Sequence, residues 1–202
     1  MMKFTGVSQF LDRLGYQEDP MAVFYTDREP SGGCSPEPAK LLTREREESG
    51  EMNWKEAFST WKCLMSQVWL ARRKQTFAWF SAERFGCFGG AYYLGFNPEQ
   101  PETSIQFVST GIPGVLPGER YFDSPDAARS FFERLSPVPA GGKYCVVKPL
   151  SQLAEDEEPE IIVFFARPEV IAGLQFLVMF ATNDQEGTRS PWGSACSNMV
   201  TM

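Results

Sequence analysis

Tyr144-Cys145-Val146-Val147 is an uninterrupted apolar run of strand length. A strand that is covered on both faces needs no alternating polar residues, so this run predicts a strand inside a sheet. A second such run follows at Ile161–Phe165, and further β-prone stretches lie at Ala22–Tyr25 and Gln75–Phe80. Together they predict a mixed sheet with strands near residues 21–26, 75–80, 144–148 and 160–166.

Between these strands, apolar residues recur at helical spacing. They predict four main helices: near residues 4–14, over about 54–73, from Ser124-Pro125 to before Pro137, and from Pro168 to about Ala181. Strands and helices that follow one another in this way indicate the α/β class, with helices packed on the sheet. The last helix is so apolar that we expect it between layers or at a subunit contact, which would make the protein a homodimer.

The composition limits the class of protein and its partners. Of the 202 residues, 43% are hydrophobic and 22% are charged, which is typical of a folded chain and fits a single α/β domain over residues 1–202. The net charge of −7 opposes binding to a phosphate backbone, so we expect no nucleic-acid partner. No apolar stretch reaches the roughly 18 residues of a membrane span, and the N-terminus lacks a secretory apolar region. We therefore expect a cytoplasmic protein without a membrane partner.

The chain contains no histidine, which is the most common general base and metal ligand. Its absence excludes the Ser-His-Asp, Cys-His and HExxH mechanisms. Carboxylates alone can perform acid–base catalysis, but no pair in this sequence can be placed at a defined separation. The acidic stretch Glu155–Glu160 lacks the ligand spacing of a calcium loop and is expected to be a solvated connection. The sequence leaves open whether the protein is an enzyme, and it names no catalytic residue.

The five cysteines are odd in number and widely spaced: Cys34, Cys63, Cys87, Cys145 and Cys196. In a chain without a signal peptide this favours reduced thiols over a disulfide framework. No CxxC pair occurs, so a zinc ribbon or finger is excluded. Each thiol can be a small buried hydrophobe, as free cysteines usually are, or part of a site assembled from distant positions. We expect Cys145 in the core and Cys34 in an exposed loop.

Glycines surround Cys87 in the stretch Phe85-Gly-Cys-Phe-Gly-Gly-Ala-Tyr-Tyr-Leu-Gly-Phe96. They permit either a close approach of the backbone to a ligand or a tight contact with a neighbouring segment, and both interpretations remain open. If residues 88–96 open a helix, the dipole and free N–H groups lower the pKa of the Cys87 thiol and favour anions. Gly89 and Gly90 are therefore candidate ligand-binding residues. Ser194 is a third, because it can cap a helix that carries a cysteine in its first turn.

The two halves of the chain, about 1–120 and 121–202, are weakly alike. Val23-Phe24-Tyr25 and Val163-Phe164-Phe165 are each followed by a long helix, a loop and a cysteine, Cys87 in the first half and Cys196 in the second. A pseudo-twofold arrangement would bring these two cysteines together. It predicts two weakly related α/β halves around a central cleft that both cysteines line.

The sequence resembles the bacterial and archaeal domain-of-unknown-function 169 (DUF169) family from about Phe10 to its end. The resemblance rests on Cys63, Cys87-Phe-Gly-Gly-Ala-Tyr-Tyr-Leu-Gly95, Pro149-Leu150, Ile162-Val163-Phe164 and Ser194-Ala195-Cys196. It implies that Cys63, Cys87 and Cys196 are recurring cysteines, and it implies no reaction. Family members typically carry further sequence with another cysteine in a Pro-Cys-x-Gly setting, so we expect the natural domain to extend beyond this chain.

These observations leave four functions to weigh. The first is a module that binds a small anionic or apolar ligand, or a cofactor, in the predicted cleft. The second is an iron–sulfur cluster or soft metal held by the thiolates of Cys63, Cys87 and Cys196, because soft thiolates select such cofactors. The third is thiol chemistry at Cys87 resolved by Cys196, which requires a lowered thiol pKa. The fourth is a structural or partner-binding domain.

Overall fold

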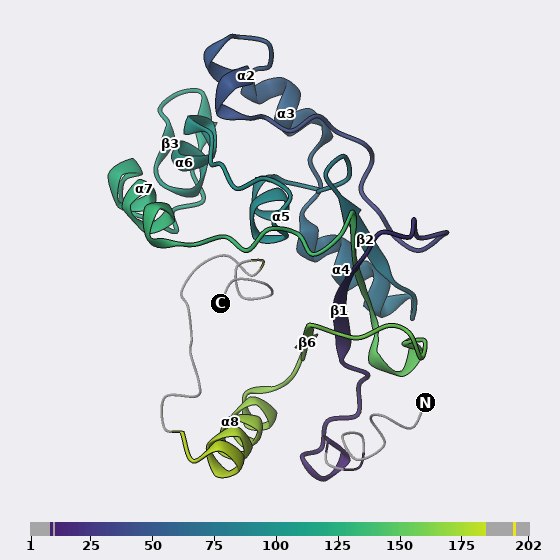
Figure 1. The fold of residues 1–202 in the computed structure, drawn as a ribbon. Helices are drawn as coiled ribbons and strands as arrows, with labels where there is room; N and C mark the ends of the chain where they lie inside the picture. The colour runs from purple at the N-terminus through teal and green to yellow at the C-terminus, as the bar shows by residue number, and fades with distance from the viewer. Residues whose placement is uncertain (1–8, 10, 185–195, 197–202) are drawn as a thin grey trace.

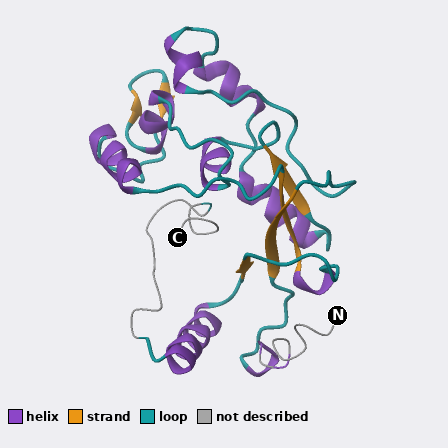
Figure 2. Cartoon of the chain, viewed as in Figure 1, coloured by secondary structure: helices purple, strands orange, loops and turns teal. Residues whose placement is uncertain are grey.

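The structure is a computed structural model that describes residues 9, 11–184 and 196 (Figure 1). Its elements follow in this order: β1 (Met21–Thr26), α2 (Arg44–Glu48), α3 (Trp54–Thr60), α4 (Leu64–Arg73), β2 (Ala78–Ser81), α5 (Phe88–Tyr93), α6 (Glu102–Val108), β3 (Gly111–Ile112), β4 (Leu116–Pro117), α7 (Pro125–Arg134), β5 (Tyr144–Pro149), η1 (Leu150–Gln152), β6 (Ile161–Val163) and α8 (Pro168–Thr182). The described chain combines these helices with a four-stranded and a two-stranded sheet, which confirms the predicted α/β class (Figure 2).

The main sheet has the strand order β2-β5-β1-β6. Its pairings are antiparallel, and Val147 of β5 lies between Val23 of β1 and Ala78 of β2. The sheet was expected to be mixed, but a parallel contact occurs only as a bridge from Cys34 to Ala78 among the described residues. Successive residues of β1 and β5 are buried. A central strand that is covered on both faces has the same continuous apolar run in a parallel and in an antiparallel sheet.

The predicted strand positions agree closely with the observed ones. The strands predicted near residues 21–26 and 144–148 are β1 and β5, whereas the one near 75–80 begins later and the one near 160–166 is shorter. The helix predicted from Ser124 is α7, and the Ser124 hydroxyl accepts a hydrogen bond from the Ala127 N–H at 3.2 Å. Most of the helix predicted near residues 4–14 lies outside the described residues. Its described part contains helical backbone around Leu11.

The long helix predicted over residues 54–73 is instead two helices, α3 and α4, with a break at residues 61–63. The Lys62 N–H donates to the Gly86 carbonyl at 2.9 Å, and the Trp61 ring lies 3.8 Å from that of Phe88 between centroids. These contacts turn the chain out of the helix while the apolar periodicity continues. Cys63 is consequently an exposed residue immediately before α4, and not a residue within one continuous helix.

The core lies where α4 covers the sheet. Leu64 and Val68 of α4 are fully buried and share a cluster with Phe80, Val147 and Cys145. Beyond this core, α2, α3, α6, α7 and β3 gather at one end of the molecule, with α5 between them and β2 (Figure 1). Neither α2 nor α6 was predicted, and a short hairpin, β3–β4, follows α6.

Helix α8 lies at the opposite end of the molecule from α7 (Figure 1). It contacts the chain through Val170 and Leu174, which pack near Leu11. Phe176 and Phe180 are 69% and 84% exposed, so within the described residues the helix is not covered by other layers. The homodimer and the two pseudo-related halves remain predictions. In the part of the chain that the structure describes, no helix has the length and apolarity needed to cross a bilayer.

Candidate functional site

A pocket of about 380 Å³ lies among helices α3 to α7. Four of the six predicted site residues line it: Cys63, Cys87, Gly89 and Cys196. They come from three places that are far apart in the sequence, namely the α3–α4 break, the start of α5, which holds both Cys87 and Gly89, and the region after α8. Both cysteines of the predicted cleft thus border one cavity.

Aromatic side chains form half of the wall, with nine of the 18 described lining residues aromatic. On one side Phe58 lies 4.0 Å from Trp61 and 4.8 Å from Phe107, measured between ring centroids. On the other side Phe131 lies 5.1 Å from Phe122 and 5.5 Å from Phe132. Such edge-on and tilted contacts fix the rings relative to one another, so the pocket has a defined shape.

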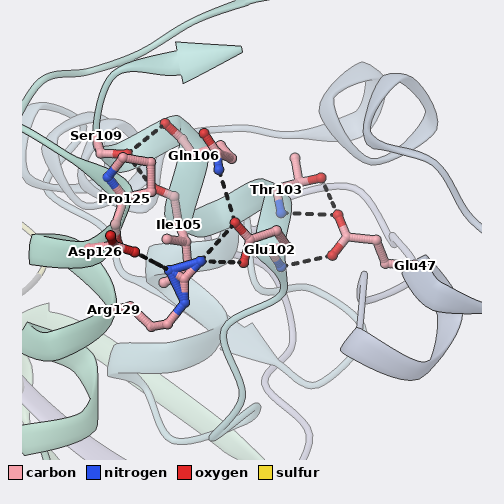
Figure 3. Close-up of polar contacts among 9 residues, drawn as sticks. All are labelled: Glu47, Glu102, Thr103, Ile105, Gln106, Ser109, Pro125, Asp126 and Arg129. Carbon is pink, nitrogen blue, oxygen red and sulfur yellow. Dashed lines mark hydrogen bonds and ion pairs between the residues drawn. The ribbon is translucent and has the colours of Figure 1, made fainter.

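A polar network holds α6, which contributes Phe107 to the wall (Figure 3). The Glu47 carboxylate of α2 accepts hydrogen bonds from the backbone N–H groups of Glu102 and Thr103 at 2.8 and 3.0 Å, and from the Thr103 hydroxyl. It therefore caps α6, whose own preceding residue is Pro101 and offers no side-chain cap.

The same network joins α6 to α7 (Figure 3). The Arg129 guanidinium donates to both carboxylate oxygens of Glu102 at 3.1 Å and also approaches Asp126 at 3.4 Å. Both contacts come from the same guanidinium nitrogen, Nη2, so the pair lacks the two parallel bonds of a bidentate arrangement. Because these side chains are about half exposed, the pair links α6 to α7 and contributes little to stability. Phe131 and Phe132 of α7 thereby face the pocket together with Phe107.

Cys87 lies immediately before α5, as the sequence predicts for a helix that opens at residue 88. Its thiol does not have the expected low pKa. Burial raises the pKa of Cys87 and outweighs the backbone N–H groups of Leu64 and Gly90, which face the sulfur and lower it. The neighbouring Cys63 raises it further, because two thiolates repel each other. A helix of six residues has too small a dipole to overcome this desolvation.

The two candidate glycines have packing roles. A Cβ on Gly89 would lie 2.9 Å from the Cys196 sulfur, so the glycine lets this buried thiol approach α5. A Cβ on Gly90 would lie 2.1 Å from the Phe85 carbonyl oxygen, and Gly90 does not line the pocket. Ser194, the third candidate ligand-binding residue, lies outside the described residues.

The other two cysteines lie away from the pocket. Cys145 is fully buried in β5 as predicted, and burial raises its pKa to about 12. Cys34 is half-buried and not in an exposed loop, because its N–H donates to Phe77 at 2.8 Å and its carbonyl accepts from Trp79 at 2.9 Å. These bonds extend the edge of the sheet next to β2. Among the described residues, no three Cys, Asp or Glu side chains are grouped so that they could hold a metal ion.

The polar residues of the pocket are few and carry no positive charge. Gln100 and Ser104 are buried and hydrogen-bonded to each other at 2.5 Å, whereas Glu119 and Tyr121 are exposed. No Lys or Arg is among the described residues that line the cavity. The sequence patterns did not predict this aromatic wall. The available signal was the high content of Phe, with 17 residues, including the adjacent pair in α7.

No curated protein and no solved structure matches the chain. The model of the DUF169 family, described as an uncharacterised ArCR, matches residues 9–202. The match includes every residue of the pocket and the motifs around Cys63, Cys87 and Cys196. Because it extends over nearly the whole chain, the protein belongs to the DUF169 family.

Proposed function

We propose that the protein binds a small, largely apolar organic ligand in the pocket bordered by Cys87 and Cys196. The observation that carries this proposal is the wall itself, in which half of the lining residues are aromatic. A volume of about 380 Å³ is within the range of roughly 300–1,000 Å³ that is usual for small-molecule sites. A few convergent polar groups, Gln100, Ser104 and Glu119, would orient the ligand.

Of the two ligand types that the sequence left open, the apolar one is better supported than the anionic one. The lining residues include the carboxylate of Glu119 and, among those described, no Lys or Arg to neutralise an anion. Backbone N–H groups near Gly90 were the proposed anion donors, and the Gly90 N–H faces the Cys87 sulfur. An anion placed here would lose its hydration without gaining a positive partner.

Binding of the neutral fluorophore N-phenyl-1-naphthylamine tests the proposal. The fluorophore should bind the wild-type protein at one site, and Val108→Trp should weaken this binding at least roughly tenfold by filling the pocket. Val115→Trp is the matched control, since Val115 is 51% exposed in the β3–β4 turn and does not line the cavity. Met65→Trp fills the pocket from α4, and circular dichroism shows which variants fold. Equal binding by all folded variants would contradict the proposal.

A soft-metal or iron–sulfur site is the second candidate, supported by the three thiols of Cys63, Cys87 and Cys196 on one cavity. It ranks below ligand binding because, among the described residues, no three such groups are placed to hold one ion. Iron and sulfide in protein purified without oxygen, lost in Cys87→Ser, would favour it.

A further inference from the structure

We infer that the ligand of the pocket is an organic cation with a flat or apolar body, such as an aromatic amine or a quaternary ammonium compound. This inference rests on the proposed function and adds the charge of the ligand to it. Three features of the described residues support it. Among these residues, the Glu119 carboxylate has no positively charged partner, the aromatic rings of the pocket have faces that attract cations, and no Lys or Arg lines the pocket.

Glu119 supplies a negative charge that its surroundings leave unneutralised. Its carboxylate forms no hydrogen bond or ion pair with another described residue, although its backbone N–H donates to Phe107 at 2.7 Å. The groups that interact with it electrostatically are Cys87 and Tyr121, both of which are neutral or negative. Partial burial raises the pKa of Glu119, which is the effect of desolvation without a compensating cation.

The aromatic rings supply a second source of negative potential. The face of an aromatic ring attracts cations through its quadrupole, most strongly for Trp. The described chain contains five pairs in which a Lys or Arg lies over a ring, and the rings are those of Trp54, Trp69, Phe165, Trp79 and Phe24. None of these five rings lines the pocket. Trp61 and the phenylalanine rings of the pocket therefore have no cation from the described residues over their faces.

A cation is the ligand that satisfies both features at once. It would pair with the Glu119 carboxylate and lie against the ring faces, while its apolar body would fill the remaining volume. A neutral ligand would leave Glu119 unpaired in a partly desolvated site, and an anion would be repelled by it. The net charge of −7 adds a long-range attraction for cations.

Three probes with the same ring system test the charge. They are trimethyl(2-naphthylmethyl)ammonium, its uncharged carbon isostere 2-(2,2-dimethylpropyl)naphthalene, and 2-naphthylmethanesulfonate, each used to displace N-phenyl-1-naphthylamine from the full chain. We expect the cation to bind roughly tenfold more tightly than the isostere, and the sulfonate most weakly. Glu119→Gln should remove most of the advantage of the cation and leave the isostere unchanged. Glu133→Gln, which changes an exposed carboxylate on α7 outside the pocket, should change neither.

The outcomes separate this inference from the proposed function. If the isostere binds as tightly as the cation, and Val108→Trp still blocks both, the pocket binds apolar ligands and the inference about charge is wrong. If the cation keeps its advantage in Glu119→Gln, the carboxylate is not its partner and the inference is likewise overturned. If no probe binds to the folded wild-type protein, the proposed function itself fails.

Discussion

Cys87 lies where two electrostatic effects oppose each other. Its position before α5 directs the Gly90 N–H at the sulfur, which favours the thiolate, while burial against α4 and α5 favours the neutral thiol. Burial is the larger effect, so the pKa of Cys87 rises. A nucleophilic role for Cys87 requires the opposite shift, and the structure therefore gives thiol chemistry less support than ligand binding.

Alkylation rates measure this directly. With iodoacetamide near pH 7.5, exposed Cys63 should react first and Cys87 at least about tenfold more slowly, because reaction requires an accessible thiolate. Raising the pH should accelerate Cys87, since a raised pKa delays formation of its thiolate to higher pH. Peptide mass spectrometry would follow each site, with Cys145 unmodified in the folded protein and equal labelling after denaturation as controls. Fastest labelling at Cys87 at neutral pH would restore the reactive-thiol hypothesis.

At the scale of elements, the break between α3 and α4 shapes the site. It places Trp61 against Phe88 and turns Cys63 toward the pocket. The break depends on Gly86, which has a φ of +82° and accepts a hydrogen bond from Lys62. A Cβ on Gly86 would lie 2.6 Å from the Lys62 carbonyl oxygen.

Gly86→Ala should therefore lower the free energy of unfolding by more than the roughly 1 kcal/mol expected from positive φ alone. Gly114→Ala is the matched control, because Gly114 has a φ of +71° and nothing within 4 Å of an added Cβ. Urea titration followed by Trp fluorescence would measure both variants. The difference between them is the effect of crowding at Lys62. Equal losses would show that the break does not depend on this close contact.

At the scale of the whole molecule, the two ends have different surfaces. One end encloses the aromatic pocket, and the other carries α8, whose Phe176 and Phe180 are exposed. A helix that buries only Val170 fully keeps an apolar surface in water, which is unfavourable for a monomer. The homodimer predicted from the sequence would cover this surface with the same helix of a second copy.

Light scattering after size-exclusion chromatography tests the dimer. The wild-type protein should have twice the mass of one chain at micromolar concentration, and the double variant Phe176→Glu and Phe180→Glu should have the mass of one chain, because charges oppose burial at an interface. Val138→Glu changes an apolar residue that is 68% exposed elsewhere and should leave the dimer intact. A wild-type mass equal to one chain would show that α8 is not a dimer interface.

Local patterns in the sequence account for the secondary structure that needs no distant partner. The run at Tyr144–Val147 is a strand because its residues are apolar and β-prone, and Ser124-Pro125 starts α7 because the serine caps the helix and the proline suits its first turn. The buried Cys145 follows from the same run. The recurring motifs around Cys87 and Cys196 also sufficed to identify the family.

Contacts between distant segments produced the remaining features. Local sequence patterns do not predict such contacts. Apolar periodicity runs unbroken through residues 54–73, while the bond from Lys62 to Gly86 ends α3. Glu47 caps α6 from another helix, so α6 has no cap of its own to recognise. The pocket joins rings from Phe58 to Phe132, which periodicity marks only as apolar. A cavity forms where side chains from several helices meet without filling the space, and that geometry exists only after the chain has folded.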